Sequence, residues 1–241
     1  MNPTSANTVS AKQYWVVVPA AGMGARMGSD IPKQYLRLGA KTIIEQTLER
    51  LLKIPSLCGI VVTVAATDLR WRELPVSRHP LIHTVAGGSE RAHSVLNGLE
   101  YLQKELQPED WVLVHDAARP CITLANIASL CGQLENDPVG GILAIQVKDT
   151  LKQVETGKDI ARTLDRRGLW HAQTPQLFRY QLLRDCLQQT LARNENITDE
   201  ASALELCGYR PKVIEGREDN IKITRPEDLL LADFILQHQE K

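Results

Sequence analysis

The sequence predicts an α/β fold in which a mostly parallel sheet carries helices on both faces and a β-hairpin arm projects from it. Over the first 150 residues, short apolar runs alternate with segments whose apolar residues recur at helical spacing. This alternation indicates βαβ units with right-handed crossovers. Residues 148–175 interrupt it with two short alternating runs around Thr156-Gly-Lys-Asp, which indicates the hairpin.

The strands are predicted from runs of β-branched and other apolar residues. Five runs precede the hairpin and one small run follows it: 15–18, 59–65, 82–85, 111–116, 140–147 and 212–215. Continuous apolar runs of this length suit strands that are buried on both faces, as in a parallel sheet.

The helices are predicted from apolar periodicity and from residues that cap helix starts. Thr42 and Glu45 match a capping box, Thr123 starts another helix, and Thr198-Asp199-Glu200 caps a short one. The remaining helical segments are a short polar helix or loop at 67–78 and helices at 90–106, from 179, and at 227–239.

Composition indicates one soluble globular domain. The chain has 241 residues, 43% of them hydrophobic and 24% charged, and a net charge of −1, which argues against a surface that coats nucleic acid. No apolar run approaches the ~18 residues of a membrane span. The five cysteines are scattered without C-x-x-C spacing, which favours reduced thiols in the cytoplasm over zinc or disulfides. We expect a disordered tail over 1–13 and a single domain over 14–241.

The loop after the first strand is rich in small residues and carries two cations. Ala20, Ala21, Gly22, Gly24 and Gly28 surround or flank Arg26, and Lys33 follows in Pro-Lys-Gln. Backbone N–H groups of such a loop can point at phosphate oxygens.

Two better-known glycine motifs do not fit this loop. The dinucleotide motif G-x-G-x-x-G fails because its third glycine position is Met27, and the Walker pattern is absent. A nicotinamide oxidoreductase is therefore disfavoured, and the loop is predicted to cradle a polyphosphate.

Two further charged loops follow predicted strands, at 87–94 and 116–120. Ligands of parallel sheets bind at the carboxyl ends of the strands. We therefore expect these two loops and the loop at 20–33 to converge on one crevice.

Several motifs in this order resemble those of the 2-C-methyl-D-erythritol 4-phosphate cytidylyltransferases of the non-mevalonate isoprenoid pathway. They are A-A-G-x-G-x-R-M-G followed by P-K-Q-Y, G-G-x-x-R-x-x-S-V, V-H-D-A-A-R-P, T-D-E-A-S-A-L-E and D-N-I-K-I-T-R-P-E-D. The resemblance covers about residues 16–232. It implies a Rossmann-like sheet of the nucleotide-diphospho-sugar transferase type.

The resemblance implies transfer of CMP from CTP to 2-C-methyl-D-erythritol 4-phosphate, giving 4-CDP-2-C-methyl-D-erythritol and pyrophosphate. The acceptor phosphate would attack the α-phosphate in line. Because this phosphate is already anionic, no general base is needed, and cations with positioning supply the catalysis. The resemblance assigns Arg26 and Lys33 as catalytic. It also implies Mg²⁺, held mostly by CTP phosphates, with Asp116 as the candidate carboxylate ligand.

The resemblance also implies two sets of binding residues. The CTP set is Ala20, Ala21, Gly22, Gly24, Gly88, Ser89, Ser94, Asp116 and Ala117. The acceptor set is Arg166, Lys222, Thr150, Arg119, Thr174 and Thr198. Some relatives carry an acidic residue at the Ser89 position, so a contact from this side chain is in doubt. Arg91 either braces its loop or touches ligand, and His115 is expected to be structural.

The hairpin needs a partner surface, because a lone hairpin is marginally stable in water. We expect a homodimer in which Arg166 and Thr150 reach the neighbouring subunit's site. Two alternative functions remain: a cytidylyltransferase for ribitol 5-phosphate or another polyol phosphate, and a nucleotide-binding regulatory module without catalysis.

Overall fold

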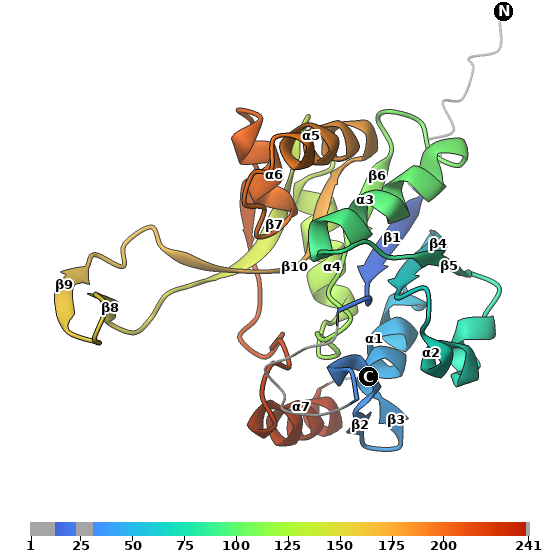
Figure 1. Cartoon of the computed structure of the whole chain (residues 1–241), viewed down its shortest axis with the longest axis horizontal. Helices are drawn as coiled ribbons and strands as arrows, with labels where there is room; N and C mark the ends of the chain where they lie inside the picture. Colours follow the sequence, from blue (N-terminus) through green and yellow to red (C-terminus); the bar gives the residue numbers. More distant parts are fainter. Residues whose placement is uncertain (1–12, 23–30, 240–241) are drawn as a thin grey trace, which may run out of the picture.

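The computed structural model describes residues 13–22 and 31–239 of the chain. A seven-stranded sheet runs through the centre of the molecule in the order β11-β7-β10-β6-β1-β4-β5 (Figure 1). The bounds of these strands, in chain order, are β1 Tyr14–Pro19, β4 Leu57–Val64, β5 Ile82–Ala86, β6 Trp111–Val114, β7 Gly140–Gln146, β10 Trp170–Arg179 and β11 Lys212–Glu215. The expected tail lies almost wholly outside the described residues.

Most neighbouring strands of the sheet are parallel. β1 pairs in parallel with β4 and β6, β4 with β5, and β7 with β11. β10 runs antiparallel to both of its neighbours, β6 and β7. The predicted fold class, a mostly parallel sheet with helices and a hairpin, is thereby confirmed.

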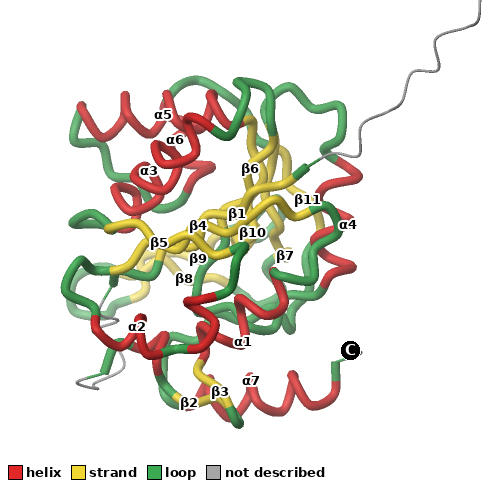
Figure 2. The backbone as a smooth tube through the Cα atoms, turned by 90° about the vertical axis from the view of Figure 1, so that its right-hand side faces the viewer, coloured by secondary structure: helices red, strands yellow, loops and turns green. Residues whose placement is uncertain are grey.

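The helices cover both faces of the sheet (Figure 2). Three pack on the face that Trp15 and Val17 point toward: α3 Arg91–Tyr101, α5 Tyr180–Ala192 and α6 Glu200–Leu206. On the other face, α1 Ile43–Leu51 and α4 Leu124–Gln133 pack with Val16 and Val18. The alternation along β1 thus divides the core into two layers, as expected for a strand buried on both sides.

Side-chain caps fix several helix starts where the sequence predicts them. Thr42 and Glu45 form the predicted capping box of α1, and the Thr123 hydroxyl accepts the Asn126 N–H at the start of α4. The short helix α6 is capped by Asp199 with Ser202, so Asp199 and not Thr198 supplies the capping oxygen. The predicted helix 90–106 ends early, with α3 passing into a 3₁₀ turn at Leu102–Lys104.

The remaining elements lie at the periphery. The polar segment at 67–78 forms α2 Leu69–Glu73 and a 3₁₀ turn at Pro75–Arg78. The C-terminal helix α7 Glu227–His238 packs against the ribbon of β2 Arg37–Leu38 and β3 Lys41–Thr42, around a third small core that includes Leu38, Ile223 and Ala232. In the described part of the chain, no helix has the length and apolarity that a membrane crossing requires.

The arm is the hairpin of β8 Leu151–Val154 and β9 Ile160–Leu164, which projects from the body (Figure 1). The predicted arm, 148–175, is too long at its C-terminal end, because residues 170–175 belong to β10. The polar run Gln173-Thr174-Pro175 conceals this strand, since proline is rare in central strands. The register between β10 and β7 shifts between Ala172 and Gln176, which accommodates the proline.

Candidate active site

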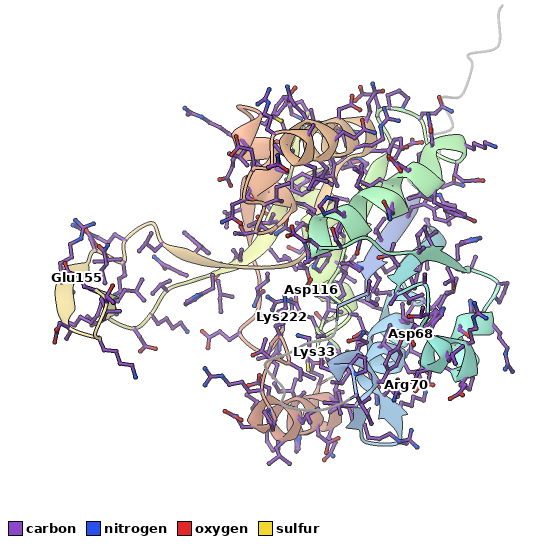
Figure 3. The ribbon with its side chains drawn as sticks, viewed as in Figure 1. Lys33, Asp68, Arg70, Asp116, Glu155 and Lys222 are labelled. Atoms are coloured by element: carbon purple, nitrogen blue, oxygen red, sulfur yellow. The ribbon has the colours of Figure 1, made fainter. Side chains whose placement is uncertain are left out.

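A cavity of about 260 Å³ lies at the carboxyl ends of β1, β5 and β6. The three charged loops meet there, as predicted, and a fourth segment contributes Lys222. Figure 3 shows Lys33, Asp116 and Lys222 gathered in the middle of the molecule. The lining residues are Pro19, Ala20, Ala21, Gly22, Lys33, Gln34, Gly88, Ser89, Glu90, Arg91, Ser94, Asp116, Ala117, Ala118 and Lys222.

The buried amide of Gln34 holds the first wall of the cavity. Its Nε2 donates to the carbonyls of Ala20, at 2.8 Å, and Gly22, at 3.1 Å. This pair of bonds ties the end of the first strand to the 3₁₀ turn Lys33–Tyr35. The Lys33 ammonium is thereby directed into the cavity, where its Nζ donates to the Ile223 carbonyl at 2.9 Å. Gly24 and Arg26 lie outside the described residues.

The second wall depends on the close approach of Gly87 and Gly88. A Cβ at Gly87 would lie 2.4 Å from the Ala21 Cβ, and one at Gly88 would lie 2.3 Å from the His93 Cβ. The buried Ser94 hydroxyl accepts the Gly88 N–H at 3.1 Å and donates to the Glu90 carbonyl at 3.0 Å. Only glycine allows the two loops to come this close.

If the cytosine of CTP lies against the backbone of Ala20, Ala21 and Gly88, as the resemblance implies, two of the N–H groups there already have partners in this structure. The Ala20 N–H donates to the Thr63 carbonyl at 2.8 Å, and the Gly88 N–H is bonded to Ser94. The carbonyl of Gly88 and the backbone of Ala21 remain candidates for base contacts. Ser89 is exposed, with its hydroxyl 3.4 Å from His93 Nδ1.

We expect Gly88→Ala to weaken CTP binding about tenfold, because the added methyl must displace His93 or the loop, at a cost of about 1–3 kcal/mol. Isothermal titration with CTP measures this loss. Gly132→Ala is the matched control, since a Cβ there meets nothing within 4 Å. Unchanged CTP affinity in Gly88→Ala would show that this wall does not shape the nucleotide site.

The carboxylate of Asp116 is the centre of a cluster of cations. Its Oδ1 accepts the Arg91 Nε–H at 3.0 Å, and its Oδ2 lies 2.8 Å from Lys222 Nζ. Arg119 Nε approaches Oδ2 at 3.7 Å. Burial alone would raise the pKa of Asp116, but the three cations outweigh it and hold the pKa well below its ordinary range. Asp116 is therefore a fixed anion that gathers cations at this end of the cavity.

His115 is buried beneath the cavity, which supports the structural role predicted for it. Its Nδ1 lies 3.1 Å from the Thr174 hydroxyl and its Nε2 lies 3.1 Å from the Arg119 carbonyl. Burial lowers the pKa of His115 from 6.5 to about 4, so the ring is neutral near pH 7.

The depressed pKa of His115 predicts a pH-dependent stability. Between pH 6.5 and about 4, His115 is protonated in the unfolded chain but stays neutral in the folded chain. The free energy of unfolding therefore falls as the pH falls through this window. The full contribution is about 3 kcal/mol. Urea titrations from pH 4 to 7.5 measure it, and His115→Gln should flatten the dependence while the exposed His238→Gln should not. An equal slope in His115→Gln would contradict this assignment.

The residues predicted to bind the acceptor separate into three groups. Lys222 lines the cavity. Arg119 and Thr174 are buried behind it: Arg119 Nη1 donates to the Asn220 carbonyl at 2.7 Å, and Thr174 Oγ1 accepts the Asp116 N–H at 3.0 Å. They hold the loop that carries Asp116.

The third group lies away from the cavity of its own chain. Thr150 and Arg166 are exposed at the base of the arm, where Arg166 donates to the Lys148 carbonyl, and Thr198 is exposed before α6. In the described part of the chain, the residues that line the cavity do not include any of these three.

Sequence reasoning missed two residues of this region. In the sequence, Gln34 is only part of the P-K-Q motif and Glu200 is only an acid at a helix start. Glu200 in fact forms a two-bond ion pair with Arg91, at 2.6 and 3.0 Å. Their separation of 109 residues leaves no local signal of this contact. Of the two roles that the sequence leaves open for Arg91, the structure shows the brace, through Glu200 and Asp116, and Arg91 also lines the cavity.

No cluster of three or more histidine, cysteine, aspartate or glutamate side chains that could hold a metal occurs in the described ranges 13–22 and 31–239.

A larger groove, of about 1190 Å³, runs beside α7 and α1. It lies away from the strand ends, and its lining mixes acidic and basic side chains, namely Glu49, Asp219 and Asp233 with Arg50, Lys53 and Arg217. The smaller cavity gathers cations from separate segments, and we therefore assign the site to it.

A mostly parallel sheet with a cationic cavity at its strand ends is the architecture of α/β proteins whose ligands bind at the carboxyl ends of the strands. The family model of 2-C-methyl-D-erythritol 4-phosphate cytidylyltransferase (IspD) matches residues 14–238. The chain belongs to this family.

Relatives and solved structures agree with the family match. The 2-C-methyl-D-erythritol 4-phosphate cytidylyltransferases of Salmonella schwarzengrund and Escherichia coli O127:H6 are each 53% identical to this chain, over 93% of it and 95% of their own length. A crystal structure of the Francisella tularensis enzyme is similar with a TM-score of 0.82 and 38% identity, covering 93% of this chain and all of that one. A crystal structure of a 4-diphosphocytidyl-2C-methyl-D-erythritol synthase gives the same TM-score at 37% identity, over 94% and 99% of the two chains.

Proposed function

We propose that this chain transfers CMP from CTP to 2-C-methyl-D-erythritol 4-phosphate and releases pyrophosphate. The observation that carries the proposal is the convergence of Lys33, Asp116 and Lys222 in one cavity at the strand ends. The names of the relatives that match over 93% of the chain support the choice of acceptor. A ribitol 5-phosphate acceptor has no such support, and a binding module without catalysis would have no need of a separate cation, Lys222, facing the acceptor side of the cavity.

The residues of the cavity divide the work between nucleotide and acceptor. The small residues Ala20, Ala21 and Gly22 leave room for the nucleotide beside the cavity wall. Lys33 neutralises the charge that grows on the α-phosphate and the leaving pyrophosphate as the bond to it breaks. Lys222, held by Asp116, receives the acceptor phosphate. Arg26, outside the described residues, is proposed to add a second cation at the triphosphate.

The acceptor phosphate attacks as an anion, so the protein has to overcome repulsion between two anions and align them. No proton has to be removed from the nucleophile. Cations fixed by buried hydrogen bonds are suited to this task because they need not reorganise during the reaction.

Asp116 can accept Mg²⁺ only together with the triphosphate. Each of its oxygens has one close donor and keeps a further lone pair for a metal. The three surrounding cations oppose a bare divalent ion at this position. Mg²⁺ would thus be held mainly by CTP phosphates with Asp116 as one protein oxygen, and when bound it would neutralise charge on the phosphates.

We further propose that the chain forms a homodimer through its arm and acts in the cytoplasm. Val154 and Ile160 at the arm's far end are 54% and 62% exposed, and Trp170 near its base is 40% exposed. Covering these side chains with a second copy would stabilise the hairpin. Thr150 and Arg166 would then reach the neighbour's cavity. The five cysteines, none of which forms a disulfide in the described residues, and the use of CTP favour a cytoplasmic location.

Mixing two inactive variants tests whether the dimer shares its sites. A hybrid of Arg166→Ala and Lys33→Ala subunits contains one site with both residues intact, so random exchange should restore about a quarter of the wild-type rate. The rate is followed after the subunits are mixed, and native mass spectrometry verifies that they exchange. Exchange without recovery would contradict a shared site, and a monomeric wild type would contradict the dimer itself.

Pyrophosphate release tests the proposed reaction. The purified protein is given Mg²⁺ and CTP with either 2-C-methyl-D-erythritol 4-phosphate or ribitol 5-phosphate. We expect release with the first acceptor only. Release with ribitol 5-phosphate alone would change the assigned substrate, and no release from folded protein that still binds CTP would favour a binding module.

A further inference from the structure

Glu200 is a buried carboxylate beside a site that has to bind anions. It is the first residue of α6, is 1% exposed, and does not line the cavity. Taking a charge out of water costs several kcal/mol unless a partner compensates it. A carboxylate can stabilise the N-terminus of a helix while its side chain stays in water, and it then avoids the cost of desolvation. The burial of Glu200 therefore calls for a role beyond the helix start.

The partner of Glu200 is the guanidinium of Arg91, which uses every one of its nitrogens. Nη1 and Nη2 donate to the two oxygens of Glu200 at 2.6 and 3.0 Å, and Nε donates to Asp116 Oδ1 at 3.0 Å. Burial works against the charge of Arg91, but the carboxylates of Glu200 and Asp116 outweigh it and raise the pKa of Arg91. Because the guanidinium is planar and rigid, a fork fixed on Glu200 also fixes the direction of Nε.

The connection continues from Asp116 to the acceptor end of the cavity. With Oδ1 held by Arg91, Oδ2 is presented to Lys222 Nζ at 2.8 Å. Without the Glu200 charge, the Arg91 fork would be free to bind both oxygens of Asp116, the arrangement that guanidinium and carboxylate favour. That arrangement would compete with Lys222 for Oδ2.

The start of α6 is held independently of Glu200. The buried Gln176 side chain donates to Asp199 Oδ2 at 2.8 Å and accepts the Ala201 N–H at 3.0 Å. Asp199 also caps the helix by accepting the Ser202 N–H at 2.9 Å. The position of α6 thus does not require the charge on Glu200, which allows the charge to be removed without removing the helix.

We propose that Glu200 is a positioning residue for the transfer reaction, acting through Arg91 to orient Asp116 and so to place Lys222 for the acceptor phosphate. This inference rests on the proposed function, because it takes Lys222 as the acceptor contact. Glu200 touches neither substrate.

The kinetic test compares Glu200→Gln with Glu205→Gln, which removes the same charge from the exposed side of the same helix. We expect Glu200→Gln to raise the KM for the acceptor about tenfold and to lower kcat about tenfold, while the Kd for CTP titrated without Mg²⁺, where no metal links it to Asp116, changes less than twofold. Glu205→Gln should match the wild type. Equal weakening of both substrates, together with a lowered Tm, would indicate a merely structural role and overturn the proposal.

A double-mutant comparison tests the route through Asp116. If Glu200 acts only through this carboxylate, adding Glu200→Gln to Asp116→Asn should change kcat/KM less than twofold further. A further loss equal to that of Glu200→Gln alone would mean that the two residues act independently, and would overturn the route.

A crystal structure of Glu200→Gln provides a measurement that does not depend on turnover. We expect Arg91 to turn its fork to Asp116 and the distance from Lys222 Nζ to Asp116 Oδ2 to exceed hydrogen-bond length. An unchanged contact between Lys222 and Asp116 would overturn the proposal even if the enzyme is active. Conversely, failure of the wild type to use the acceptor would count against the proposed function while leaving this structural result to be judged separately.

Discussion

Replacement of Lys33 by alanine is expected to lower kcat on the order of a hundredfold or more, corresponding to about 3–4 kcal/mol of transition-state stabilisation. Its ammonium lies inside the cavity, 2.9 Å from the Ile223 carbonyl, on a turn that Gln34 fixes to the first loop. A cation held in this way is already in place when charge develops on the phosphates. The Kd for CTP should rise by a smaller factor than kcat falls, because the negative charge that faces the Lys33 ammonium is greatest in the transition state.

Steady-state kinetics and CTP titration measure the two effects of Lys33→Ala separately. Lys53→Ala is the matched control, since it removes an exposed lysine that faces the larger groove beside α7. It should retain wild-type activity. Near-normal kcat in Lys33→Ala, with the fold intact by circular dichroism, would contradict the electrostatic account of this site.

Replacement of Asp116 by asparagine is expected to abolish most activity and to lower the free energy of unfolding by about 3 kcal/mol. The substitution keeps the size of the side chain but leaves Arg91, Arg119 and Lys222 near one another without their shared anion. Mutual repulsion then displaces Lys222 from its position. The loss of stability follows because at least Arg119 is buried and cannot move into water.

Urea unfolding and the transfer assay test this second prediction. Asp185→Asn is the control, because the exposed Asp185 forms an ion pair with its neighbour Arg184 and does not line the cavity. Stability and activity in Asp116→Asn that both match this control would show that the cation cluster does not depend on Asp116.

The parts of the fold that the sequence predicts are those with a strong local pattern. The apolar run at the first strand, the Thr42 capping box and the arm turn at 156–159 each determine their structure through neighbouring residues. The convergence of the three loops also follows, because it is a consequence of parallel strand topology.

The parts that could not be predicted depend on contacts between distant segments. β10 lies in the sheet despite Pro175, because its place between β6 and β7 is fixed by strands far away in the chain. The same holds for Arg119 and Thr174, which the resemblance places at the acceptor but which lie buried behind Asp116. The pattern of neighbouring residues in the sequence does not indicate which distant loops a side chain will contact in the folded chain.

A crystal structure with CTP and Mg²⁺ would test most directly the claim that CMP transfer occurs in the cavity at the strand ends. We predict a triphosphate beside Lys33, a base against Ala20, Ala21 and Gly88, and Lys222 left facing the open side where the acceptor enters. A nucleotide bound in the groove beside α7, with the strand-end cavity empty, would contradict the account.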